Sequence, residues 1–200
     1  MNVSARYLLA LGALMLAACA GPRIRVQVDE AAAMQRLQAR EQVLANAPVW
    51  TLRGRLGVSD GRDGGSGTLE WTQRADAFRF SVHAPVTGKT WTLAGTPSHA
   101  VLSGLRPTPV EGGDARALLA RELGWDVPVA HLVDWVRGMR APGDARVEFR
   151  TDGLPAAITQ HGWRVEFLDY DERAPPLPRR LHASSGSRKV RLAIREWSVE

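Results

Sequence analysis

The strongest constraint on the fold of this chain is an alternation of apolar and polar residues that begins at Trp50. In residues 50–58, leucine and valine alternate with threonine and arginine, and the glycine-rich segment 60–66 then reverses the chain. The same period of two recurs in three further segments, residues 68–72, 78–83 and 90–93. Successive side chains of a strand point to opposite faces, so each segment has one apolar face. Strands in close succession with short turns predict an antiparallel meander.

A helical stretch interrupts the strands between residues 113 and 138. Gly113 and Asp114 are typical of a helix start, and Gly124 is typical of its end. A second short helix is expected from Pro128 to Gly138, with leucine, valine and tryptophan on one face. Beyond a short candidate at residues 101–103, the remaining strands are expected after the helices, at residues 147–150, 156–161, 163–170, 180–183 and 189–197.

About ten strands that share one apolar face need a cover for that face. Two short helices can plug a curved sheet, but they are hardly large enough to fill a wide one. The sequence therefore predicts a mainly β half-barrel with a helical lid and a residual apolar cavity, suited to a hydrocarbon. The seven tryptophans favour such a pocket, because wide rings line irregular cavities well. Composition alone is equally compatible with the alternative that every tryptophan lies in a filled hydrophobic core.

The N-terminus predicts export and lipid attachment. After Arg6 comes an apolar run of 12 residues, a length typical of a signal peptide and too short to cross a bilayer as a helix. The run ends in Leu16-Ala17-Ala18-Cys19, and Cys19 is the only cysteine of the chain. We therefore expect residues 1–18 to be a lipoprotein signal peptide. The alternative is an ordinary secretory signal that holds a cysteine at the cleavage point by chance.

Lipidation of Cys19 fixes where the mature chain should reside. The cysteine is expected to carry N-acyl and S-diacylglycerol groups, and two or three acyl chains anchor a protein far more firmly than one. Ala20 is not the aspartate that retains enterobacterial lipoproteins in the inner membrane. We therefore expect a lipid anchor in the outer membrane of a Gram-negative bacterium, facing the periplasm.

One domain should follow the anchor. Residues 19–28 are interpreted as the lipidated cysteine and a tether, and residues 29–200 as a single domain without internal repeat or linker. The domain should open with a helix from Asp29 to about Ala45, which Pro48 ends.

Charge and motifs argue against nucleic-acid binding and catalysis. The formal charge is +5, but the arginines are spread along the chain without the basic stripe that nucleic acid requires. The sequence has no nucleophile elbow, phosphate-binding loop or His-Glu-x-x-His motif. The five histidines lie far apart in sequence, and the acidic residues near Asp171 favour a solvated loop over a calcium site. We therefore expect no catalytic residue, no metal and no cofactor apart from the lipid on Cys19. A hydrolase is disfavoured because the nucleophile motif is missing.

Several short motifs follow one another along the mature chain. They are Trp50-x-x-x-Gly54-Arg55-Leu56, Leu69-x-Trp71-x-Gln73, Glu122-Leu-Gly-Trp125-x-x-Pro128-Val129-x-x-Leu132-x-x-Trp135-x-x-Gly138, Gln160-x-Gly162-Trp163, Leu177-Pro178-x-x-Leu181 and Arg191-Leu-x-Ile194-x-x-Trp197. Each motif is weak alone. Together with Cys19 and its flanking residues they resemble the outer-membrane lipoprotein LolB family, over essentially the whole mature chain.

The resemblance implies a fold and a function. The fold would be an open antiparallel half-barrel of about eleven strands, whose apolar concave cavity is covered by short helices. Such a protein accepts lipoproteins from the soluble periplasmic carrier LolA and inserts them into the outer membrane, without a nucleotide. The implied partners are a LolA-like carrier, lipoprotein acyl chains and outer-membrane lipid; we expect a monomer. A lipoprotein that binds another amphiphile, or an assembly scaffold with a packed core, is the alternative.

The resemblance also implies a protruding loop with an apolar residue that meets the membrane, usually leucine between proline and glycine. The matching residues here are Pro85, Val86, Thr87 and Gly88. Valine is smaller than leucine, and a simple turn between strands is the alternative. For the acyl-chain cavity, alternation and the helical faces give eleven candidates, of which we expect about half to touch ligand: Leu56, Leu69, Trp71, Phe80, Trp91, Leu93, Trp125, Leu132, Trp135, Trp163 and Ile194.

Overall fold

A computed structural model describes residues 29–85 and 88–200. The predicted signal peptide, Cys19 and the tether up to residue 28 lie outside the described residues, as do Val86 and Thr87 of the predicted membrane loop. None of the helices in the described ranges is long and apolar enough to cross a bilayer.

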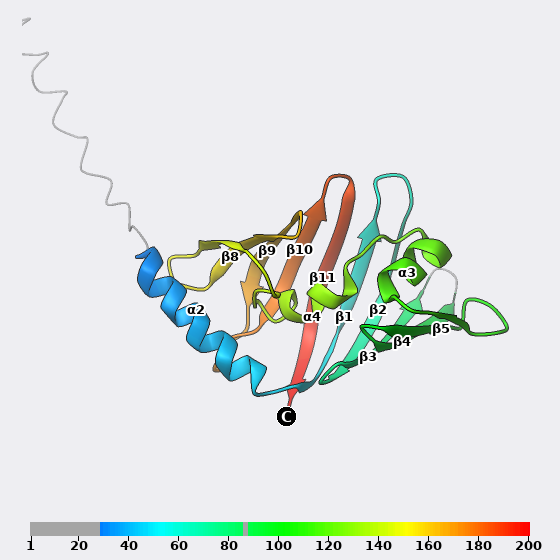
Figure 1. Cartoon of the computed structure of the whole chain (residues 1–200), viewed down its shortest axis with the longest axis horizontal. Coiled ribbons are helices and arrows are strands. Elements are labelled where there is room, and N and C mark those ends of the chain that lie inside the picture. Colours follow the sequence, from blue (N-terminus) through cyan, green and yellow to red (C-terminus); the bar gives the residue numbers. More distant parts are fainter. Residues whose placement is uncertain (1–28, 86–87) are drawn as a thin grey trace, which may run out of the picture.

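One eleven-stranded antiparallel sheet forms the body of the protein (Figure 1). Its order is β6-β5-β4-β3-β2-β1-β11-β10-β9-β8-β7, so the first and last strands pair at the centre. This confirms the predicted open antiparallel fold. The strands are β1 (Val49–Ser59), β2 (Gly64–Arg74), β3 (Ala77–Ala84), β4 (Lys89–Thr96), β5 (His99–Ser103), β6 (Val110–Gly112), β7 (Arg146–Phe149), β8 (Pro155–Gln160), β9 (Trp163–Tyr170), β10 (Pro178–Ser185) and β11 (Arg188–Val199).

The sheet order explains why helices cover one face. β6 and β7 follow one another in the chain but form opposite edges of the sheet, so the segment between them must cross a face. That segment, residues 113–145, contains α3 (Ala115–Leu123) and α4 (Val129–Trp135), which lie in front of the strands in Figure 1. We call it the lid. As predicted, Asp114 caps α3 by accepting a hydrogen bond from the backbone N–H of Arg116 at 3.0 Å. Gly124 ends it in the left-handed conformation, with φ 71°.

Gly54 is required where β1 meets β11. The register of the two strands shifts between Arg53 and Gly54, which is the mark of a β-bulge. A Cβ atom on Gly54 would lie 2.3 Å from the carbonyl oxygen of Ala193. Only glycine therefore allows the two backbones to approach this closely at the central pairing of the sheet.

The first helix is tied to the rest of the fold by a buried arginine. α2 (Glu30–Ala45) buries Leu37 and Leu44, and Arg40 on the same face is 8% exposed. Its guanidinium donates hydrogen bonds to the carbonyl oxygens of Gly138 at 2.8 Å, Arg137 at 2.6 Å and Pro176 at 2.6 Å. One side chain thus joins α2 to the end of the lid and to the loop before β10.

Replacing Arg40 should therefore destabilise the whole domain. For Arg40→Met we expect a loss of about 2–4 kcal/mol in the free energy of unfolding, because two buried carbonyls and one part-buried carbonyl lose a charged donor. Urea denaturation followed by circular dichroism measures this. Arg36→Met on the exposed face of the same helix is the control and should change stability by less than about 0.5 kcal/mol. Equal stability of the two variants would contradict the role of Arg40.

Candidate functional site

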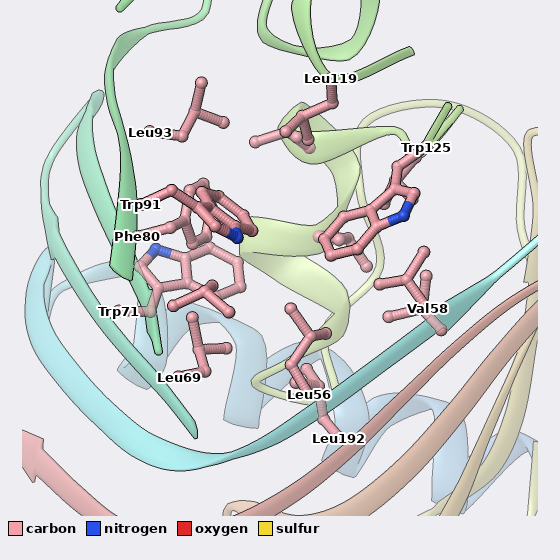
Figure 2. A pocket seen from close by; sticks show the side chains of 15 residues that line it. Leu56, Val58, Leu69, Trp71, Phe80, Trp91, Leu93, Leu119, Trp125 and Leu192 are labelled. Atoms are coloured by element: carbon pink, nitrogen blue, oxygen red, sulfur yellow. The ribbon is translucent and has the colours of Figure 1, made fainter. Parts of the chain in front are cut away.

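An apolar pocket lies between the lid and one half of the sheet (Figure 2). It occupies the end of the strands that leads to the β3–β4 loop, the position of the predicted membrane loop. Every residue on its wall is a leucine, valine, phenylalanine or tryptophan. They are Leu56, Val58, Leu69, Trp71, Phe80, Val82, Trp91, Leu93, Leu119, Trp125, Val127, Val129, Leu132, Val190 and Leu192.

Strand register brings the sheet side of this wall together. Trp71 lies opposite Phe80 on β3, which in turn lies opposite Leu93 on β4. The neighbouring row joins Leu69, Val82 and Trp91 in the same way. These residues are all inward members of the period-two pattern, so a continuous apolar surface forms. The rings of Trp71 and Phe80 make the tightest aromatic contact of this wall, with centroids 4.3 Å apart.

Trp125 closes the pocket from the lid side. Its ring meets that of Trp91 edge-on, with centroids 5.6 Å apart. It also lies against the bare backbone of Gly65 on β2, where a Cβ atom would be 2.6 Å from Cζ2 of the indole. The next residue, Asp126, accepts hydrogen bonds from Arg116 of α3 and Arg188 of β11. The bond from Arg116 lowers the pKa of the Asp126 carboxyl.

The pocket is narrow. Its cavity volume is only about 50 Å³. An apolar cavity of about 150 Å³ is needed to hold a molecule the size of benzene. The site therefore has a wholly apolar lining but no room for a hydrocarbon chain.

The structure places eight of the eleven predicted cavity residues on this wall: Leu56, Leu69, Trp71, Phe80, Trp91, Leu93, Trp125 and Leu132. The other three, Trp135, Trp163 and Ile194, do not line it and are buried elsewhere in the core. Trp135 sits where α4 crosses the sheet and donates a hydrogen bond to Oε1 of Gln160 at 3.2 Å. Trp163 lies near it on β9, with ring centroids 6.5 Å apart.

Sequence reasoning missed seven lining residues: Val58, Val82, Leu119, Val127, Val129, Val190 and Leu192. Four of them were available from the pattern already used. Val58, Val82, Val190 and Leu192 belong to the same alternating apolar rows of β1, β3 and β11 as the candidates Leu56, Phe80 and Ile194. The candidate membrane loop is described only at Pro85 and Gly88, so its role stays a prediction.

A second recess, the mixed cleft, opens at the opposite end of the strands with a volume of about 550 Å³. Its lining mixes apolar and charged residues: Ala45, Pro48, Trp50, Gln73, Ala75, Asp76, Phe78, Pro97, Asp114, Ala115, Val129, Ala130, His131, Val133, Asp134, Arg137, Met139 and Pro142. Arg137 is 7% exposed, lies 5.6 Å from the Trp50 ring and donates to the carbonyl oxygen of Leu44 at 2.9 Å. Burial lowers the pKa of Arg137 and raises that of Asp134.

Two histidines that lie far apart in sequence stack at the edge of this cleft. The rings of His131 and His161 are 4.0 Å apart and nearly parallel, at 5°. Nε2 of His161 lies 2.8 Å from the carbonyl oxygen of Pro142, so this nitrogen carries the proton and donates. Burial, together with the neighbouring His161 and Arg116, lowers the pKa of His131. His131 is therefore largely neutral at pH 7.

Comparison with known proteins identifies the family. The sequence profile described as outer membrane lipoprotein LolB matches residues 48–197. The chain is 39% identical over 187 residues to the outer-membrane lipoprotein LolB of Xanthomonas campestris pv. campestris (strain 8004), covering 90% of this chain and 85% of that protein. It is 38% identical over 178 residues to the same protein of Xylella fastidiosa (strain 9a5c), with 87% and 82% covered.

The fold is shared more widely than the sequence. A LolA superfamily protein from Nitrosomonas europaea superposes with a TM-score of 0.53 at 8% identity, covering 84% of this chain and 93% of that one. At such low identity the match concerns the fold alone. The sequence matches confirm the predicted resemblance, and with it the prediction that the protein is not an enzyme. The chain belongs to the LolB family of outer-membrane lipoproteins.

Proposed function

We propose that the apolar pocket receives the acyl chains of a lipoprotein from a LolA-like carrier, and that the protein then delivers the lipoprotein to the outer membrane. The observation that carries this proposal is the lining of the pocket, which is wholly apolar and lies between the helical lid and the sheet. Because the pocket has no room for a hydrocarbon chain, the lid would open to admit one. Each methylene buried there contributes about 0.8 kcal/mol. The free energy of burying the acyl chains differs between the carrier cavity, this pocket and the bilayer. These differences set the direction of transfer, and no nucleotide is required.

The anchor and the loop complete the proposal. The lipid on Cys19 would hold the protein at the outer membrane, and residues 85–88 would meet the bilayer at the pocket end of the strands. One pocket and one loop per chain are sufficient for this cycle, so we propose that a monomer carries it out.

Transfer from the loaded carrier tests the central claim. The chain from residue 20 onward contains every described residue and is mixed with purified carrier that holds a radiolabelled lipoprotein. We expect the label to move to this protein without ATP, as measured after chromatographic separation of the two. If the label stays on the carrier while circular dichroism shows a folded acceptor, transfer is contradicted and a packed scaffold becomes the better explanation.

Opening of the lid is tested at Gly65. In Gly65→Ala the new methyl group collides with the Trp125 ring, so the closed form should lose stability relative to the open one. The apparent affinity for a ligand scales with the fraction of molecules in which the lid is open. We therefore expect Gly65→Ala to bind a fluorescent fatty acid at least roughly threefold more tightly than the parent chain.

Gly57→Ala on β1 is the matched control, because a Cβ atom there meets nothing within 4 Å. Its affinity should equal that of the parent chain. Identical binding by the two alanine variants would show that Trp125 does not limit access to the pocket.

The loop is tested separately with the lipidated protein in liposomes. Val86→Glu should still capture lipoprotein from the carrier but fail to pass it to the bilayer, because a carboxylate resists transfer into hydrocarbon. The readout is sedimentation of labelled lipoprotein with the liposomes. Val43→Glu is the control, since Val43 is an exposed apolar residue of α2 (55%) away from the loop. Normal delivery by the Val86 variant would remove the loop from the mechanism.

A further inference from the structure

The face of the sheet that points away from the lid carries two shallow recesses that meet at one glycine. In β1, Leu56 and Val58 line the apolar pocket under the lid, so the residues that alternate with them point to the opposite face. The recesses on that face have volumes of about 390 and 260 Å³, and both contain Gly57 of β1 and Arg191 of β11. We call the two recesses together the outer groove.

Strand register gives the outer groove a bare floor and a cationic rim. Gly57 lies opposite Arg191 on β11 and opposite Ser66 on β2. A Cβ atom on Gly57 would meet nothing within 4 Å, so the space above this backbone is open. Arg55 and Lys189 each lie two residues from this row, on the same face, and both line the groove. Long basic side chains therefore surround a stretch of exposed backbone.

Three of these basic side chains have no carboxylate partner. Arg55, Lys189 and Arg191 are exposed, and none of them forms an ion pair within residues 29–85 and 88–200. The preceding outward residue of β1 differs, because Arg53 pairs with Glu70 at 2.8 Å. Like charges at neighbouring positions of a sheet repel one another, and a bound anion would offset that repulsion.

The carboxylates that border the groove do not cancel its charge. Asp169 lies 3.7 Å from Arg180, the fourth cation of the groove, and Glu166 pairs with Arg164 at 3.2 Å. The turn at residues 60–63 carries two aspartates and one arginine, and its first aspartate accepts hydrogen bonds from backbone N–H groups of the turn. Counted together, six cationic side chains stand against four carboxylates, a net charge of +2.

The outer groove lies at the end of the strands that carries the predicted membrane loop. β1 ends at Ser59 and β11 begins at Arg188, so the groove lies beside the β1–β2 and β10–β11 turns (Figure 1). Because neighbouring strands run in opposite directions, β3 also ends on this side, just before residues 85–88. A member of an outer-membrane lipoprotein family has a lipid surface beside it. Anionic phospholipids in that surface would present their phosphates to the groove.

We propose that the outer groove binds the phosphate groups of anionic phospholipids and thereby turns this face of the sheet toward the membrane surface. The guanidinium fork matches phosphate geometry, and the missing side chain of Gly57 lets a headgroup approach the backbone. A lipid anchor holds a domain near a bilayer but does not decide which of its faces meets the lipid. The groove supplies that orientation. The proposal goes beyond acyl transfer and does not use the apolar pocket.

Sedimentation with vesicles tests the proposal. The chain from residue 20 onward, without its lipid, is mixed with vesicles of phosphatidylcholine alone or of phosphatidylcholine with phosphatidylglycerol. We expect tighter binding to the anionic vesicles, and weaker binding as sodium chloride is raised, because salt screens exposed charges. Arg55→Gln combined with Arg191→Gln should weaken binding to the anionic vesicles roughly 25-fold, since each cation near such a surface contributes roughly fivefold.

A matched double variant separates the groove from net charge. Arg74→Gln combined with Arg79→Gln removes the same charge from two exposed arginines at the other end of β2 and β3, and neither lines the groove. This control should keep most of the binding of the parent chain. All four arginines are exposed, so both double variants should retain the circular dichroism spectrum and the melting temperature of the parent.

Three results would overturn the proposal. The first is equal binding of the parent chain to both kinds of vesicle, and the second is an equal loss in the two double variants, which would show an effect of net charge. The third is a groove variant that binds vesicles normally but no longer accepts lipoprotein from the carrier in solution, because the groove would then be a docking surface for the carrier. Failure of the parent chain to accept lipoprotein contradicts the proposed function alone, since vesicle binding does not require the pocket.

Discussion

The pairing of the first strand with the last decides most of what this protein can do. β1 and β11 meet at the centre of the sheet, and the absent side chain of Gly54 permits their close approach beside Ala193. With the chain ends at the centre, both edges of the sheet come from the middle of the sequence. The connection between those edges is then forced across the concave face. Lid and pocket follow from one strand pairing.

The two ends of the lid are held by contacts of different strength. Near Trp125, the carboxylate of Asp126 bonds Arg116 and Arg188, and all three side chains are substantially exposed. Exposed ion pairs of this kind contribute about 0–1 kcal/mol. At the other end, buried Arg40 and Arg137 bond the carbonyls that surround them, among them those of Gly138 and Leu44. The polar contacts that hold the lid are therefore weaker at Trp125, the end that covers the pocket, than at the other end.

Alternation predicted where strands run and which face is apolar, because both depend on neighbouring residues. It missed β6 (Val110–Gly112), since three residues are too few to show a period. It also gave no strand order, and so could not separate the pocket from the filled core. Trp163 alternates in the same way as Trp71 and Trp91, but Trp135 at the end of α4 lies near it, and neither ring lines the pocket. The cleft could not be predicted, because Trp50 and Arg137 meet only through the tertiary fold.

A narrow pocket suits a protein that, in the proposed cycle, must release what it binds. A palmitoyl chain buries about 15 methylene and methyl groups, and full burial would contribute about 12 kcal/mol, enough to hold the lipid for long periods. Here the cavity is only about 50 Å³, so in the proposed cycle part of that gain would be offset by the displacement of Trp125 and the lid. Apparent affinity falls by the fraction of molecules that are open. A bilayer takes up the same chain without this opening cost, so the final step toward the membrane is favoured without an external source of energy.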